Sequence, residues 1–234
     1  MRKMFVAAML LVPASLWASG GHYPVDDSVV GEPGDFVVES WVVYLDSDNR
    51  ELAVLPTLTL GGQAGRWAGL GAVDLTGGIY RIEEDGERFT RFEPAVKYRL
   101  PWSADMADMG VTAAVSFTAG FDDGRLEDWL LNVPLTFASV DAWSVHANVG
   151  WLRLRDRADG SADRLLLGLG GEFQVSEAVD VIAQIYREGA HEQPGAQLGV
   201  RFAGGSVVEV VDLAVGRVLR GDDQDWFVTV GVGF

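Results

Sequence analysis

The chain of 234 residues contains no cysteine, which excludes disulfides, thiolate metal sites and anchoring through a lipidated N-terminal cysteine. Its histidines are also few: His22, His146 and His191 are scattered and form no metal-ligand spacing. Basic residues are scarce, because 18 Lys and Arg stand against 34 Asp and Glu, giving a net charge of −16. We therefore expect no metal, no cofactor and no nucleic-acid partner.

Long apolar runs are missing as well. No stretch approaches the roughly 20 apolar residues that a membrane-spanning helix needs. The longest apolar run, residues 4–16, follows Arg2 and Lys3 and precedes small residues near Ala18. This order predicts a secretory signal peptide at residues 1–19 and hence an exported protein.

What the chain has instead is alternation. In residues 111–121, for example, Val111, Val115 and Phe117 fall on one face of an extended strand, while Thr112 and Ser116 fall on the other. Such segments recur about twelve times, at 35–45, 50–61, 67–82, 88–102, 110–121, 127–139, 142–154, 164–175, 179–188, 195–203, 207–219 and 225–234. The pattern predicts an all-β fold, a transmembrane up-and-down antiparallel β-barrel of about 12 strands in residues 35–234, behind a periplasmic segment at residues 20–34.

The connections between these segments fall into two alternating classes. One class is charged, as in "DSDNR" and "EEDGER", and the other is shorter or less charged, as in "VDA" and "SEA". This asymmetry is typical of barrels in the outer membrane of Gram-negative bacteria, and it predicts that both termini are periplasmic. The alternative is a periplasmic sandwich or lipocalin-like barrel, in which all the aromatic-ended apolar faces would have to fill one interior.

The last segment, "WFVTVGVGF", ends the chain on an apolar face. In a closed barrel this strand pairs with the first one, so that its edge is covered and its apolar face meets membrane lipid. We predict that Trp226 and Phe234 form an assembly signal read by the barrel-assembly machinery. Aromatic residues at segment ends also predict girdles at the two membrane interfaces; they are Trp102, Trp129, Trp143, Trp151, Trp226 and Phe234.

The basic residues gather in or beside the charged connections. One interpretation is that they contact the phosphates of lipopolysaccharide, with loop carboxylates binding bridging divalent cations. The other is that connections are simply polar. The residues include Arg81, Arg88, Arg125, Arg153, Arg155, Arg157, Arg217 and Arg220.

Charges within the predicted strands are the main clue to function. In "RFEPAVKYRL", one face carries Arg91, Glu93, Lys97 and Arg99. Because each Arg or Lys on the lipid face would cost about 2–4 kcal/mol at mid-depth, these side chains must face the lumen.

Other inward charges complete the candidate lumen set of Glu39, Arg91, Glu93, Lys97, Arg99, Glu172 and Arg201. The face of Glu39 is ambiguous, since Trp41 would share it. These residues either select small solutes in a narrow path or form a salt-bridged filling. A backbone diameter of about 24 Å favours a small-solute channel over a general porin.

An enzyme is the less favoured alternative. Ser144, His146 and Asn148 share an inward face, but side chains at i and i+2 run about 7 Å apart, which predicts no direct Ser–His hydrogen bond. A lipid-active hydrolase would also need its site at the lipid boundary. We therefore expect no catalytic activity.

The segment "HYPVDDSVVGEPGDFVVES" resembles the start of the putative outer-membrane transporters of the phenol-degradation meta-pathway, through His22, Pro24, Asp26, Asp27, Gly31, Gly34 and Glu39. "VKYRL" at 96–100 is similar to that family's Lys-Tyr-Arg run. The chain departs from the pattern at Tyr23 and in the turn "GEPG". The resemblance implies passive uptake of small hydrophobic or aromatic compounds.

Overall fold

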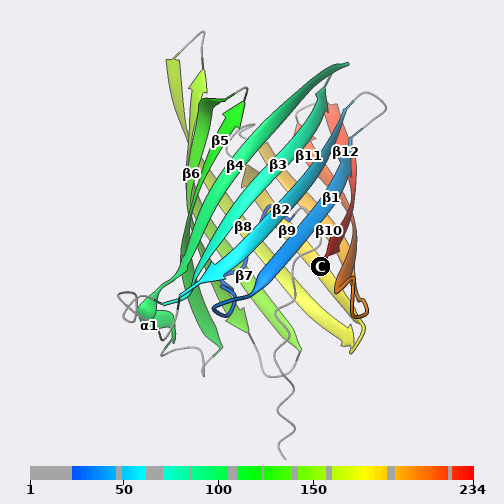
Figure 1. Cartoon of the computed structure of the whole chain (residues 1–234). Helices are drawn as coiled ribbons and strands as arrows, with labels where there is room; N and C mark the ends of the chain where they lie inside the picture. The colour runs from blue at the N-terminus through cyan, green and yellow to red at the C-terminus, as the bar shows by residue number, and fades with distance from the viewer. Residues whose placement is uncertain are drawn as a thin grey trace, which may run out of the picture.

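A computed structural model describes residues 23–45, 49–61, 71–84, 86–104, 110–122, 124–138, 142–156, 160–188, 193–220 and 223–234. The predicted signal peptide at 1–19 lies outside these residues. The described residues form twelve strands and one short helix (Figure 1). They are β1 (Phe36–Tyr44), β2 (Arg50–Leu60), β3 (Val73–Glu84), β4 (Glu87–Arg99), α1 (Pro101–Ala104), β5 (Val111–Asp122), β6 (Arg125–Ala138), β7 (Trp143–Asp156), β8 (Gly160–Ser176), β9 (Val179–Glu188), β10 (Gln193–Ala203), β11 (Val210–Arg220) and β12 (Asp223–Gly233).

The strands close into a barrel in which each pairs antiparallel with its neighbour in sequence and β12 pairs with β1. The seam is completed by the last residue, because Val38 and Phe234 exchange two backbone N–H···O bonds of 3.0 Å. The predicted antiparallel barrel is confirmed, and most predicted bounds agree with the strands. The third strand is described from Val73, and residues 67–70 of its predicted range lie outside the described residues. The helix α1 was not predicted.

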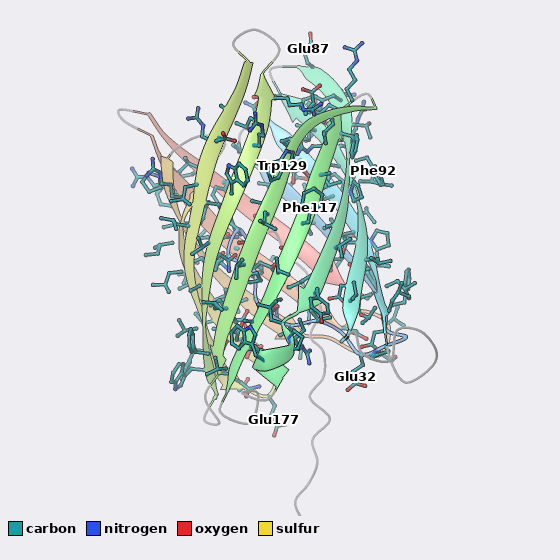
Figure 2. All side chains as sticks on the ribbon, turned by 90° about the vertical axis from the view of Figure 1, so that its left-hand side faces the viewer. Glu32, Glu87, Phe92, Phe117, Trp129 and Glu177 are labelled. Carbon is teal, nitrogen blue, oxygen red and sulfur yellow. The ribbon has the colours of Figure 1, made fainter. Side chains whose placement is uncertain are left out.

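The two ends of the barrel differ in their connections. We call the end that carries α1 and Phe234 the α1 end, and the end that carries the β1–β2, β3–β4, β5–β6, β7–β8, β9–β10 and β11–β12 connections the hairpin end. Glu87 lies at the hairpin end, and Glu32 and Glu177 lie at the α1 end (Figure 2). The charged connections found in the sequence therefore share one end.

The wall is apolar outside and polar inside. Large apolar side chains are exposed on the outer face, among them Ile79, Val149 and Leu165 at 52%, 53% and 54%. Buried polar side chains line the interior, including Asn132, Asn148 and Gln184. This distribution is the reverse of that in a lipocalin-like barrel and suits a wall surrounded by lipid. Within the described part of the chain, no helix is long and apolar enough to cross a membrane.

An aromatic cluster fills part of the interior beside the seam. Trp41 packs with Val43, Ala53 and Phe227, and its ring meets Tyr80 edge to face with 6.2 Å between centroids. Because the Trp41 side chain is buried inside the barrel, the ambiguity of the first strand is resolved. Trp41 and Glu39 both belong to the inward face.

Aromatic residues on the outer face form contacts between neighbouring strands. Trp129 and Trp151 meet edge to face with centroids 4.7 Å apart, and Phe117 lies 6.0 Å from Trp129. Phe117 and Trp129 lie on the wall in the half nearer Glu87 (Figure 2). Such pairs add stability beyond the apolar area that they cover.

Candidate functional site: the lumen and its N-terminal strap

The lumen is occupied by the segment that precedes β1. Residues 23–31, here called the strap, lie inside the barrel near the α1 end, where Figure 1 shows the first described residues in blue. The sequence led us to treat residues 20–34 as a periplasmic segment separate from the barrel. In the structure, polar groups of the inner wall bind the backbone of the strap.

The strap contacts the strands in reverse order. Gln184 on β9 makes two 3.1 Å hydrogen bonds with Val25, accepting from its N–H and donating to its carbonyl. Asn148 on β7 accepts from the N–H of Asp26 at 2.8 Å and donates to its carbonyl at 2.6 Å. The N–H of Ser28 donates to the hydroxyl of Thr136 on β6 at 3.0 Å. Side-chain amides thus replace the backbone partners that an irregular segment lacks.

The far end of the strap continues along β5, β4 and β3. The hydroxyls of Ser28 and Thr112 share a hydrogen bond. Arg99 donates to the carbonyl of Val30, and the N–H of Gly31 donates to Asp74 at 3.2 Å. Nine residues at about 3.3 Å each extend roughly 30 Å, enough to pass seven inward faces in a lumen of this size.

Two strap carboxylates neutralise a lumen cation. The ammonium of Lys97 lies 2.9 Å from Asp26 and 3.3 Å from Asp27, and its side chain is only 17% exposed. A buried ammonium without a partner would be costly, so the strap and Lys97 depend on each other. Lys97 and Arg99 were predicted to face the lumen, and both contact the strap.

Small residues on β8 make room for the strap. A Cβ added at Gly168 would lie 2.7 Å from Val25 Cγ2, and one at Gly170 would lie 3.3 Å from Val25 Cγ1. Only glycine lets the strap lie so close to this strand. Gly168 and Gly170 of the run "GLGG" therefore allow the strap to lie against β8.

A second charged group surrounds Arg201 on β10. Arg201 pairs with Asp212 at 3.0 Å and with Glu172 at 3.5 Å, and the Arg201 and Asp212 side chains are 6% and 1% exposed. The guanidinium carbon also lies 5.6 Å from the centre of the Tyr23 ring, a cation–π contact with the strap. Two predicted lumen residues, Glu172 and Arg201, thus lie together.

A third charged group lies further toward the hairpin end. Arg91 binds Glu93, pairs with Asp128 at 2.7 Å and lies 3.7 Å from Asp122. Among the described residues, the ion-pair partners of Arg91 all lie on strands. It links β4, β5 and β6 through their inward faces.

Glu39 stands apart from these pairs. It makes no ion pair with any residue that the structure describes, and the charges that act on it most strongly are those of Asp27 and Lys97.

Ser144 and His146 are closer than the strand spacing suggests. Their Oγ and Nε2 atoms lie 3.0 Å apart, so the prediction of no direct hydrogen bond was wrong. The reason is that both side chains bend along the strand. The other ring nitrogen, Nδ1, lies 3.0 Å from the Thr136 hydroxyl, whereas the Glu172 carboxylate lies 4.0 Å from Nε2 and not at Nδ1, where the carboxylate of a catalytic triad binds. Across the described ranges, no group of three His, Asp or Glu residues is arranged to hold a metal ion.

The sequence reasoning missed several acidic residues that line the lumen or belong to its strap. Asp74 on β3 and Asp212 on β11 stand at the alternating positions whose side chains face the lumen. The alternation of the sequence could therefore have identified both as lumen residues. Asp26 and Asp27 carry no such signal, because the strap is not a strand.

The family of the chain is settled by sequence. The model of a family described as "Uncharacterised conserved protein UCP029691" matches residues 7–234. The chain belongs to this family. The resemblance to the phenol meta-pathway transporters is not confirmed by this match and stays a hypothesis. No curated protein matches the chain.

Several solved structures are similar in fold to this UCP029691 family member. The NanC porin in a rhombohedral crystal form is similar at a TM-score of 0.56 and 9% identity, over 86% of this chain and 99% of that chain. A structure from a study of in-meso crystallisation of membrane proteins gives 0.46 and 10%, over 86% and 83%. A Rhodopseudomonas blastica porin variant gives 0.34 and 11%, over 85% and 98%. The NanC likeness supports the fold of the barrel.

Proposed function

We propose that this protein is an outer-membrane channel for the passive passage of small solutes, with the strap forming the narrowest part of the path. The observation that carries the proposal is the polar and charged lining of the lumen, in which an irregular segment is held by side chains from successive strands. Polar groups at this depth are costly, and a barrel that served only as a wall could fill its interior with apolar side chains.

The strap determines which solutes are expected. It places Asp26 and Asp27, two carboxylates, beside the single ammonium of Lys97. The chain is strongly acidic overall. We expect cations and small neutral molecules to pass more readily than anions, and small hydrophobic or aromatic solutes are the class suggested by the resemblance of the N-terminal segment.

The location follows from the same reasoning. We propose that residues 35–234 span the outer membrane of a Gram-negative bacterium and that residues 1–19 are removed on export. The α1 end, which carries Phe234, would face the periplasm, and the hairpin end would face outward.

The second candidate is a structural barrel with a closed lumen. The compact charge pairs of Arg91 and Arg201 favour it, since paired charges fill space without serving transport. In this case the strap would be a permanent part of the interior. We propose that the protein is not an enzyme, since His146 has no carboxylate at Nδ1.

Single-channel recording in planar bilayers tests the proposal. Folded wild-type protein should give discrete conductance steps with a preference for cations, and phenol-like solutes at millimolar concentration should reduce the ionic current if they share the path. Circular dichroism must show that the same sample is β-rich. Silent bilayers containing folded protein would reject the channel and leave the structural barrel.

A further inference from the structure

The outer wall is chemically different at its two ends. At the hairpin end, arginines lie on the outward face of the strands, namely Arg50, Arg81, Arg88, Arg153, Arg187 and Arg217. At the α1 end the outward face is aromatic, with exposed Phe36, Trp143, Phe173, Phe202 and Phe234. Among the described residues of a chain with so few basic side chains, this placement concentrates arginines just beyond the apolar band at the hairpin end.

Three of these arginines line one groove. The groove lies on the outer face of β1–β4, has a volume of about 330 Å³ and is lined by Arg50, Arg81 and Arg88 together with Glu83. We call it the arginine groove. Its apolar lining comes from Val42, Tyr44 and Leu52.

The charges of the groove do not cancel. Glu83 binds both Arg50 and Arg88, at 2.6 Å and 2.9 Å, while Arg81 donates to the hydroxyl of Thr90 at 3.0 Å. Glu51 also lines the groove and accepts a hydrogen bond from the indole N–H of Trp41, so three arginines stand beside two carboxylates and leave one positive charge in excess. Each guanidinium has several N–H donors, and these bonds use a minority of them. Arg50 and Arg88 remain 50% and 57% exposed, so their remaining donors are accessible.

Below the arginines, the same strands offer an apolar surface. Tyr44, Leu52 and Ile79 are 48%, 47% and 52% exposed on the outer face. A soluble anion would satisfy the guanidinium groups and leave this surface uncovered. A lipid with a phosphorylated headgroup satisfies both, because its phosphate meets the arginines while its acyl chains follow the wall.

We propose that the arginine groove binds the phosphorylated headgroup of a lipid of the lipopolysaccharide type, with the acyl chains against Leu52 and Ile79. The proposal requires the barrel to lie in the outer membrane and does not depend on channel activity. It also gives the barrel its orientation, because this lipid occupies the outward leaflet and so places the hairpin end outside.

A competing mode of binding would use carboxylates and divalent cations. Asp46, Asp48 and Asp85 belong to the adjoining connections and lie outside the described residues. Lipid bound through Mg²⁺ bridges to carboxylates is released by a chelator, whereas lipid bound by guanidinium groups is retained.

The test measures binding of bisphosphorylated lipid A to the purified protein in detergent by native mass spectrometry. The double variant Arg81→Gln/Arg88→Gln should bind about 30-fold more weakly than wild type. The matched control is Arg153→Gln, which removes an outward arginine that is paired with Asp163 at 3.4 Å and lies at the same end. The control should bind lipid A as wild type does.

A gain-of-binding variant keeps the proposal testable if the double variant folds poorly. Glu83→Gln frees two arginines and should strengthen lipid A binding, while heat-modifiable migration on gels reports whether each barrel is folded. Equal weakening in Arg153→Gln, release by EDTA, or binding of inorganic pyrophosphate as tight as that of lipid A would each overturn the proposal.

Discussion

The ammonium of Lys97 lies 2.9 Å from the carboxylate of Asp26, a residue 71 positions earlier in the chain. This ion pair joins the strap to the wall of the barrel. The alternation of β4 predicted that Lys97 faces the lumen, and the structure shows that this charge holds the strap across the lumen. The strap is therefore the first target for experiment.

Removing the charge of Lys97 should loosen the strap. In Lys97→Gln, Asp26 and Asp27 lose their cation and repel each other, so single-channel conductance should rise several-fold over wild type. Lys97→Arg is the matched control, because it keeps the charge. Asp26→Asn/Asp27→Asn leaves Lys97 unpaired and should also raise conductance. Unchanged conductance in Lys97→Gln and in the double variant would show that the strap does not limit the path.

The fit of the strap against β8 can be tested without altering a charge. Gly168→Leu should displace Val25, whereas Gly171→Leu on the same strand places its side chain outward, where a Cβ meets nothing closer than 3.6 Å. Since the chain has no cysteine, Ser28→Cys provides a single reporter at a buried strap position. Maleimide labelling of this cysteine should accelerate in Gly168→Leu, about tenfold for each 1.4 kcal/mol of strap binding lost.

The Gly171→Leu background should label at the wild-type rate. Equal rates in all three backgrounds would mean that the strap stays in place without the contact between Val25 and Gly168. Faster labelling in both variants would point to a general loosening of β8.

The Arg201–Asp212 pair should support stability. Arg201→Gln leaves the Asp212 carboxylate buried without its cation and should lower the free energy of unfolding by about 3–5 kcal/mol. Urea titration in detergent, followed by gel migration, measures this loss. Replacing both residues, as in Arg201→Met/Asp212→Leu, should recover most of it, and a double variant as unstable as the single one would contradict this account.

The last residue has two separable roles. Phe234→Ala keeps the backbone bonds with Val38, so the barrel should still fold in detergent at a rate near that of wild type. If Phe234 is also an assembly signal, the same variant should accumulate at a reduced level in the outer membrane of cells. Trp226→Ala, which changes the other proposed signal residue, should behave similarly, and normal accumulation of both variants would reject the signal.

The strands were predictable because each carries its own evidence. Side chains of β4 from Arg91 to Arg99 and of β12 from Val228 to Gly233 alternate between apolar and polar or small, so the faces of these strands follow from the sequence. The strap was not predictable, because its conformation is imposed by Asn148, Gln184 and Thr136 from strands more than 100 positions away. Side-chain rotamers could not be predicted from the sequence either, as the hydrogen bond between Ser144 and His146 shows.

The strap also constrains how the wall itself can deform. Neighbouring strands of a barrel can slide in register only if every group bonded to a shared segment moves with them, and the strap is bonded to strands from β3 to β9. It therefore fixes their relative heights and keeps the cross-section of the α1 end from flattening. A segment of nine residues in this way ties together the inner faces of strands that are not neighbours in the wall.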